Sequence, residues 1–64
     1  MIQIDEAIRL ENRSIQLIDS IKKINAYEPY LRLKYYPVLK HSIALLLQYS
    51  IILNEYYDEI KEVF

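Results

Sequence analysis

The sequence predicts an all-α protein in which a helical hairpin assembles with other chains into a multi-chain helical bundle. Apolar residues recur at steps of three and four along two long stretches, which is the period of an α-helix. Pro29 and Pro37 separate these stretches and mark the place where the chain turns back. The apolar side of each helix covers about half of its circumference, whereas one packing partner needs a stripe of only about 100°. Each helix is therefore expected to contact more than one neighbour.

The first helix is expected over residues 3–26. Its apolar residues cover an arc of roughly 200° when successive residues are placed about 100° apart. Within this arc Leu10, Leu17 and Ile24 recur at seven-residue intervals, which is typical of helices that lie side by side. A second set alternates with them and consists of Ala7, Ser14 and Ile21.

Pro29 ends the first helix, because it disfavours helical geometry at Glu28, and its fixed φ suits the start of another helix. A turn is expected near residues 25–28. The chain contains no glycine, so Asn25 is expected to take the left-handed conformation that often closes a helix.

The second proline leaves two alternatives for the second half of the hairpin. Pro37 has no N–H to donate to the carbonyl of Leu33, so the chain either kinks at this proline or starts a third helix there. Residues 29–36 are expected to form a short helix. The alternative is an extended segment, since apolar and basic residues alternate as in a strand, although the sequence offers no second strand to pair with it.

The last helix is expected over residues 37–63, and its centre is apolar nearly all round. Such a helix is normally buried on every side, and one partner helix from the same chain cannot bury it. The seven-residue repeats of both helices therefore indicate an interface between chains. The residues assigned to this oligomer interface are Leu10, Leu17, Ile21, Ile24, Leu39, Leu46, Leu53 and Ile60.

Length and composition favour a single domain, residues 1–64, that depends on self-assembly. A fold of 64 residues buries a small share of its surface and usually needs a further source of stability. The chain has no cysteine for a disulfide, and its single histidine, His41, cannot build a metal site alone. Oligomerisation, as a homodimer or a larger assembly, is the source that remains.

The charges are divided along the chain although the net charge is only -1. Residues 1–21 carry four carboxylates against two arginines, a net charge of -2. Residues 22–41 carry five basic side chains against Glu28, a net charge of +4, and residues 42–64 carry four carboxylates against Lys61, a net charge of -3. In an antiparallel two-fold dimer of hairpins, the basic turn of one copy would lie beside the acidic helix ends of the other.

Tyrosines and basic residues alternate around the predicted turn. Tyrosine and arginine are common in protein-binding hot spots, and stacking rings beside cations also bind single-stranded nucleic acid. The partner-binding candidates are Tyr27, Tyr30, Arg32, Lys34, Tyr35, Tyr36 and Lys40. The alternative interpretation is that amphipathic rings cover the turn end of the bundle, with their hydroxyls in water.

Missing residue types exclude several kinds of chemistry. Without glycine, the chain has no phosphate-binding loop, dinucleotide-binding fingerprint or nucleophile elbow. His41 shares a polar stripe with three glutamates, but the Glu-x-x-His pair of di-metal bundles is absent and a solvated face is expected. The chain is therefore expected not to be an enzyme and to need no cofactor, no metal and no small-molecule substrate.

A cytoplasmic location without a membrane partner is expected, because the apolar run from Ile43 to Leu53 is interrupted and a bilayer requires roughly 20 apolar residues. The leading hypothesis is a small regulatory, inhibitor or adaptor protein whose helical bundle binds a larger protein. The alternative is a small dimeric regulator that binds RNA or DNA through the basic, tyrosine-rich turn. A purely structural oligomer is the third hypothesis.

Overall fold

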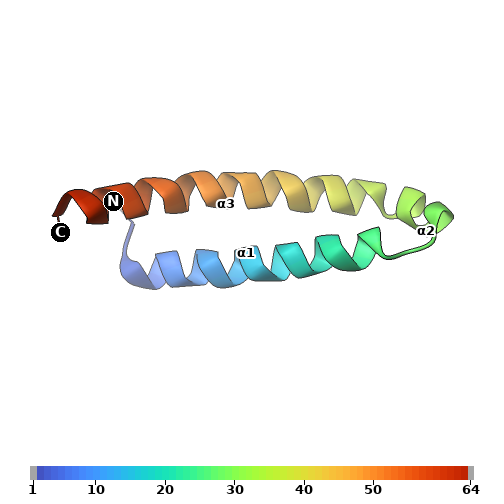
Figure 1. Ribbon diagram of the computed structural model, residues 1–64, viewed down its shortest axis with the longest axis horizontal. Coiled ribbons are helices and arrows are strands. Elements are labelled where there is room, and N and C mark those ends of the chain that lie inside the picture. The colour runs from blue at the N-terminus through green and yellow to red at the C-terminus, as the bar shows by residue number, and fades with distance from the viewer. Residues whose placement is uncertain (1, 64) are drawn as a thin grey trace.

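The computed structural model describes residues 2–63, which form three helices and, within that range, no strand. The helices are α1 (Ile4–Asn25), α2 (Pro29–Lys34) and α3 (Tyr36–Val63). Figure 1 shows α1 and α3 lying side by side in opposite directions, with α2 at the turn between them. The all-α class predicted from the sequence is confirmed.

The ends of α1 follow from its terminal residues. Asp5 and Glu6 in the first turn and Lys22 and Lys23 in the last turn have the signs that favour the helix dipole. The prediction of a left-handed Asn25 is wrong, because no described residue has a positive φ. The helix closes instead at Ala26, whose φ is -84° and whose N–H donates to the carbonyls of Lys22 and Lys23. These bonds satisfy carbonyl groups at the helix end without a left-handed residue.

Both prolines begin helices. Glu28 is extended, with φ -61° and ψ 153°, as expected for a residue that precedes proline, and Pro29 is the first residue of α2. Residues 29–34 are therefore helical rather than extended. Only Tyr35 separates α2 from α3, and Pro37 lies in the first turn of α3, where its missing N–H costs no helical hydrogen bond.

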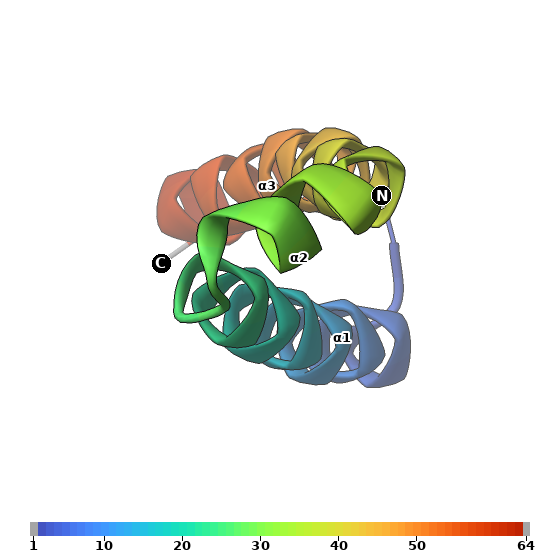
Figure 2. The same cartoon turned by 90° about the vertical axis from the view of Figure 1, so that its right-hand side faces the viewer.

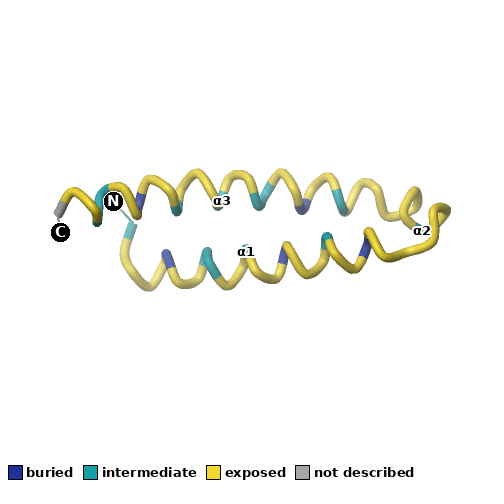
Figure 3. The backbone as a smooth tube through the Cα atoms, in the orientation of Figure 1, coloured by how far each residue is buried: buried dark blue, intermediate teal, exposed yellow. Residues whose placement is uncertain are grey.

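The core of the described chain is a narrow seam between α1 and α3. Figure 3 shows the buried and half-buried positions of both helices on the sides that face each other. The buried residues are Ala7, Leu17, Ile24, Tyr56 and Ser42, and no large side chain is fully buried. Seen along the long axis, α2 lies across the ends of the two long helices and adds no buried residue to this core (Figure 2).

The shape leaves a large surface in water. The radius of gyration is 14.7 Å, whereas a compact domain of this length has about 10.7 Å. The accessible surface is 5293 Å², whereas a compact monomer of this mass exposes about 4300 Å². The chain therefore exposes roughly 1000 Å² more than a compact monomer of its mass.

Candidate interaction surface

The eight residues assigned to the oligomer interface lie along the seam between α1 and α3 of the same chain. Leu17 and Ile24 are buried there. The other six are half-buried, and they are Leu10, Ile21, Leu39, Leu46, Leu53 and Ile60. The seven-residue repeats thus face the neighbouring helix of their own chain and leave other apolar residues exposed.

An exposed row of isoleucines runs along α1 outside the seam. Ile4, Ile8, Ile15 and Ile18 are 63%, 50%, 64% and 40% exposed. Their spacing of four, seven and three residues places them on one side of the helix. Two charged residues, Glu11 and Lys22, continue the same row, because each lies four residues from an isoleucine of the row.

A second exposed apolar row runs along α3. Tyr36, Ile43, Leu47 and Ile51 are spaced by seven, four and four residues, and all are half exposed or more. Leu47 is 62% exposed although it lies at the centre of the longest helix. We call this row and the isoleucine row of α1 together the outer face.

A hydrogen bond across the seam shows that the α1 row and the part of the α3 row near Ile43 belong to one side of the helix pair. The Tyr57 hydroxyl donates a hydrogen bond to Oε1 of Glu11, between Ile8 and Ile15 in the α1 row. Tyr57 is aligned with Ile43 of the α3 row, because fourteen residues make nearly four turns. The hydrogen bond therefore crosses from α3 to α1 on the side that carries the outer face.

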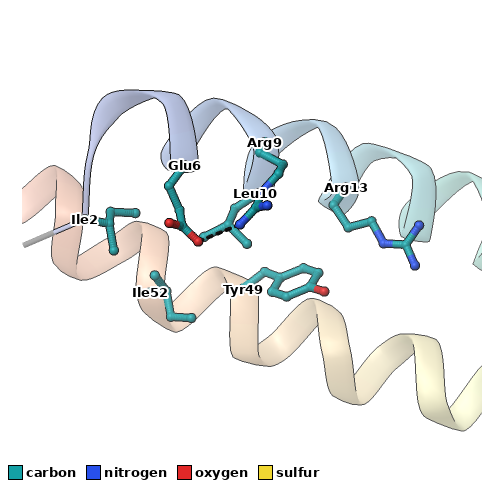
Figure 4. A pocket seen from close by; sticks show the side chains of 7 residues that line it. All are labelled: Ile2, Glu6, Arg9, Leu10, Arg13, Tyr49 and Ile52. Carbon is teal, nitrogen blue, oxygen red and sulfur yellow. Dashed lines mark hydrogen bonds and ion pairs between the residues drawn. The ribbon is translucent and has the colours of Figure 1, made fainter.

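The other side of the seam is hollowed and carries both charged and apolar side chains. A hollow of about 460 Å³ is lined there by Arg9 and Arg13 of α1 and by Tyr49 and Ile52 of α3 (Figure 4). Arg9 forms an ion pair with Glu6 at the rim, with an N–O distance of 2.7 Å. The guanidinium of Arg9 thus has a partner within the chain, and Ile2, Leu10 and Ile52 add apolar lining to the same hollow.

Three of the four serines in the helices use their hydroxyl protons within their own helix. Ser14, Ser42 and Ser50 each donate to the carbonyl four residues earlier, at distances of 2.8, 2.9 and 2.8 Å. Ser50 is exposed beside the α3 row, and its hydroxyl proton is used within the helix. A small side chain with its donor satisfied permits another helix to approach closely without a loss of hydrogen bonding.

Replacing Tyr57 by phenylalanine is expected to remove a pH-dependent part of the stability. The hydrogen bond to Glu11 raises the pKa of the Tyr57 phenol above its ordinary value, and desolvation and nearby charge act in the same direction. The folded chain therefore holds this proton more tightly than the unfolded chain, so the contribution is present below about pH 10 and is lost at higher pH. The free energy of unfolding is measured in urea at about pH 8 and at about pH 11. Its decrease between these two pH values should be smaller for Tyr57→Phe than for the natural chain. Equal losses in the two chains would contradict this role of the hydrogen bond.

The residues predicted to bind a partner lie at the turn end. The rings of Tyr27 and Tyr35 are 5.6 Å apart between centroids, and the Lys34 ammonium lies 5.8 Å from the Tyr35 ring. Lys40 lies 5.9 Å from the ring of Tyr36. The structure therefore brings these five residues into two contact groups. The two remaining candidates, Tyr30 and Arg32, are exposed on α2.

The polar stripe of α3 contains His41, Gln48, Glu55 and Glu59. Within residues 2–63, no group of three or more histidine and carboxylate side chains is placed to hold a metal ion. His41 and Glu55 are exposed, and Glu59 is half-buried near Ile2 and Tyr56. His41 and Glu55 thus offer solvated charge on the side of α3 that does not carry the outer face, whereas Oε2 of Glu59 is buried and has no hydrogen-bond partner among the described residues.

α3 also has the length and composition of a membrane span. The segment Tyr36–Glu62 contains a stretch of mean hydropathy 1.2, of which 6% is buried within the chain. The central helix of a bundle made from several chains has the same composition, since it too is apolar nearly all round. Both cases require that the apolar surface of α3 is covered by something other than α1.

In comparisons with known proteins, no family model, no curated protein and no solved structure matched this chain.

Proposed function

We propose that this chain is a non-enzymatic protein-interaction module. In this proposal the antiparallel helices form a hairpin unit that assembles with copies of itself through the outer face into a helical bundle. The bundle then binds a larger protein, as an inhibitor or adaptor, in the cytoplasm. The observation that carries the proposal is the exposure of two apolar rows, on α1 and on α3, along one side of the helix pair.

The total exposed area of the chain and the composition of the outer face support self-assembly. Soluble monomers rarely expose continuous apolar patches of more than a few hundred Å². The chain exposes roughly 1000 Å² more than a compact monomer of its mass, and a stable interface buries about 800 Å² on each partner. Assembly of two copies would therefore remove an area of the size that this chain exposes in excess.

The turn supports a separate contact with the larger protein. Its tyrosines are amphipathic, and contacts with Lys34, Lys40 and one another restrict several of the rings. A ring that is already held loses less conformational entropy when it binds a partner. In an antiparallel bundle the turns would lie at the two ends and stay accessible.

Sedimentation and affinity capture test the two parts of this proposal. The purified chain is expected to sediment at a multiple of 7.7 kDa at both about 50 and about 500 mM salt, because screening weakens contacts between charges but not the burial of the apolar rows. In affinity capture from the host, the natural chain is expected to retain a larger protein. The Tyr30→Ala variant should not retain it. The Gln16→Ala variant is the control, because Gln16 is an exposed residue of α1 outside the turn, and it should retain the same protein. A chain that remains monomeric at millimolar concentration would contradict the proposal.

Nucleic-acid binding is the second candidate function, and the clustering of Arg32, Lys34 and Lys40 with exposed tyrosines favours it. It makes the opposite prediction about salt. Affinity for single-stranded RNA or DNA should decrease about tenfold or more over the same range of salt, because counterions are released from each contacted phosphate. Arg32→Ala should weaken that binding and leave the assembly intact.

A further inference from the structure

We propose that the occupant of the outer face is a second copy of this chain in the antiparallel orientation, with α3 packed on α3 and with Lys40 of each copy facing Asp58 of the other. This inference rests on the self-assembly in the proposed function and adds its geometry. It follows from the positions of charged residues within the two apolar rows.

Lys40 lies seven residues before Leu47 and Asp58 lies seven residues after Ile51, so these charged residues continue the exposed row of α3. The part of the row from Lys40 to Asp58 has unlike charges at its two ends and apolar residues on both sides of its centre. Lys40 and Asp58 have opposite charges and are eighteen residues apart, which is five full helical turns, so they lie on one line along the helix. Each is nine residues from Tyr49, and Leu47 and Ile51 are each two residues from it. A two-fold axis at the level of Tyr49 would therefore place unlike charges together at both ends and Leu47 against the partner's Ile51.

The exposed row of α1 has the same property. Glu11 and Lys22 are the two charged residues of this row, they have opposite signs, and both are exposed or half-exposed. Ile15 and Ile18 are equally far from the midpoint between them. An antiparallel contact between the two α1 helices would thus pair each Glu11 with Lys22 of the partner subunit and bring isoleucines together at the centre.

The opposite orientation brings like charges together. With both turns at the same end, the segments of net charge +4 would be neighbours, and so would the acidic ends of all four helices. Like charges in contact weaken an interface, whereas reversal places each basic turn beside the acidic helix ends of the other copy. The charge distribution therefore favours the antiparallel form.

A second copy also fits the outer face better than lipid does. The helix pair measures 49 by 14 Å along one long side, roughly 700 Å² in projection and close to the ~800 Å² per partner of a stable interface. Hydrocarbon provides no counter-charge for Glu11 or Lys22 within the isoleucine row. A reversed copy provides one for each of them.

Charge reversal at Lys40 and Asp58 tests the geometry by sedimentation equilibrium of the full chain. Lys40→Glu and Asp58→Lys are each expected to weaken self-association about tenfold, because both ends of the interface then carry like charges. The double variant should recover to within about twofold of the natural chain. Lys40 and Asp58 are about 27 Å apart along one helix and the Debye length is about 8 Å, so recovery requires contact between chains.

Each other outcome overturns the inference. Additive losses in the double variant would show that Lys40 and Asp58 of different copies do not meet, and single variants without effect would exclude this register. Transfer of monomers from the assembly to neutral phosphatidylcholine vesicles would identify lipid as the occupant. If the natural chain never self-associates, the proposed function itself fails, and this result is distinct from the failure of the antiparallel geometry.

A distance measurement gives an independent test, because the chain has no native cysteine that would compete for a label. Spin labels are attached at Gln48→Cys and, in a separate variant, at Glu62→Cys. Residue 48 is next to the proposed axis, so its two labels should be close together along the bundle. Residue 62 is thirteen residues from Tyr49, so the two labels at this position should be about 39 Å apart along the bundle. Equal, short separations at both positions would show a parallel dimer and overturn the inference.

Discussion

Replacing Leu17 by alanine is expected to remove most of the stability of the fold. Leu17 is 7% exposed on the side of α1 that faces α3, and the only other buried apolar residues are Ala7, Ile24 and Tyr56 in the described chain. Loss of a buried leucine side chain costs about 2–5 kcal/mol, because transfer from water is lost and a cavity remains. A core of this size contributes roughly 3–5 kcal/mol in total. The single substitution is therefore comparable to the whole margin of stability.

The measurement is urea unfolding followed by circular dichroism at one fixed protein concentration, since self-association would make stability depend on concentration. The midpoint for Leu17→Ala should move close to zero urea. Leu33→Ala is the matched control, because it is the same chemical change at a residue of α2 that is 76% exposed, and it should cost less than about 0.5 kcal/mol. Similar losses in the two variants would show that the seam does not hold the helices together.

The two long helices could be predicted from the sequence to within one residue at each end, whereas the short helix expected over residues 29–36 ends two residues earlier, at Lys34. Pro29 and Pro37 fix the starts of α2 and α3, because each supplies a φ suited to the first turn and lacks only an N–H that a first turn does not use. The closure of α1 could not be predicted in the same way. Ala26 ends the helix with ordinary right-handed geometry, and nothing in its side chain distinguishes it from a helical residue.

The orientation of each helix could not be predicted, because an apolar arc of half the circumference contains more than one possible packing side. Leu46 and Leu47 are identical neighbours whose side chains point about 100° apart. The structure places Leu46 toward α1 and leaves Leu47 exposed. The hydrogen bond between Tyr57 and Glu11 also depends on this choice, since it joins residues 46 positions apart.

Replacing Leu47 by glutamate is expected to dissociate the proposed assembly into single chains. Leu47 is 62% exposed in one chain, and it would be covered by the partner in an antiparallel dimer. A carboxylate at that position would be buried without a counter-charge, and two-fold symmetry would place two such groups in each interface. The dissociation constant should increase at least about 100-fold, which corresponds to about 2.8 kcal/mol. The seam with α1 would be unchanged.

Gln48→Glu is the matched control, because it introduces the same side chain one residue away on the polar stripe and should leave the sedimenting mass unchanged.

Thermal unfolding separates the effect on assembly from the effect on folding. The midpoint of the natural chain and of Gln48→Glu should rise with protein concentration, since the folded assembly is favoured by mass action, whereas the midpoint of Leu47→Glu should be constant. In a chain that acts alone, glutamate at an exposed site would change the stability by only about 0.5 kcal/mol and the mass not at all. If Leu47→Glu sediments like the natural chain, the outer face is not the surface through which the copies meet.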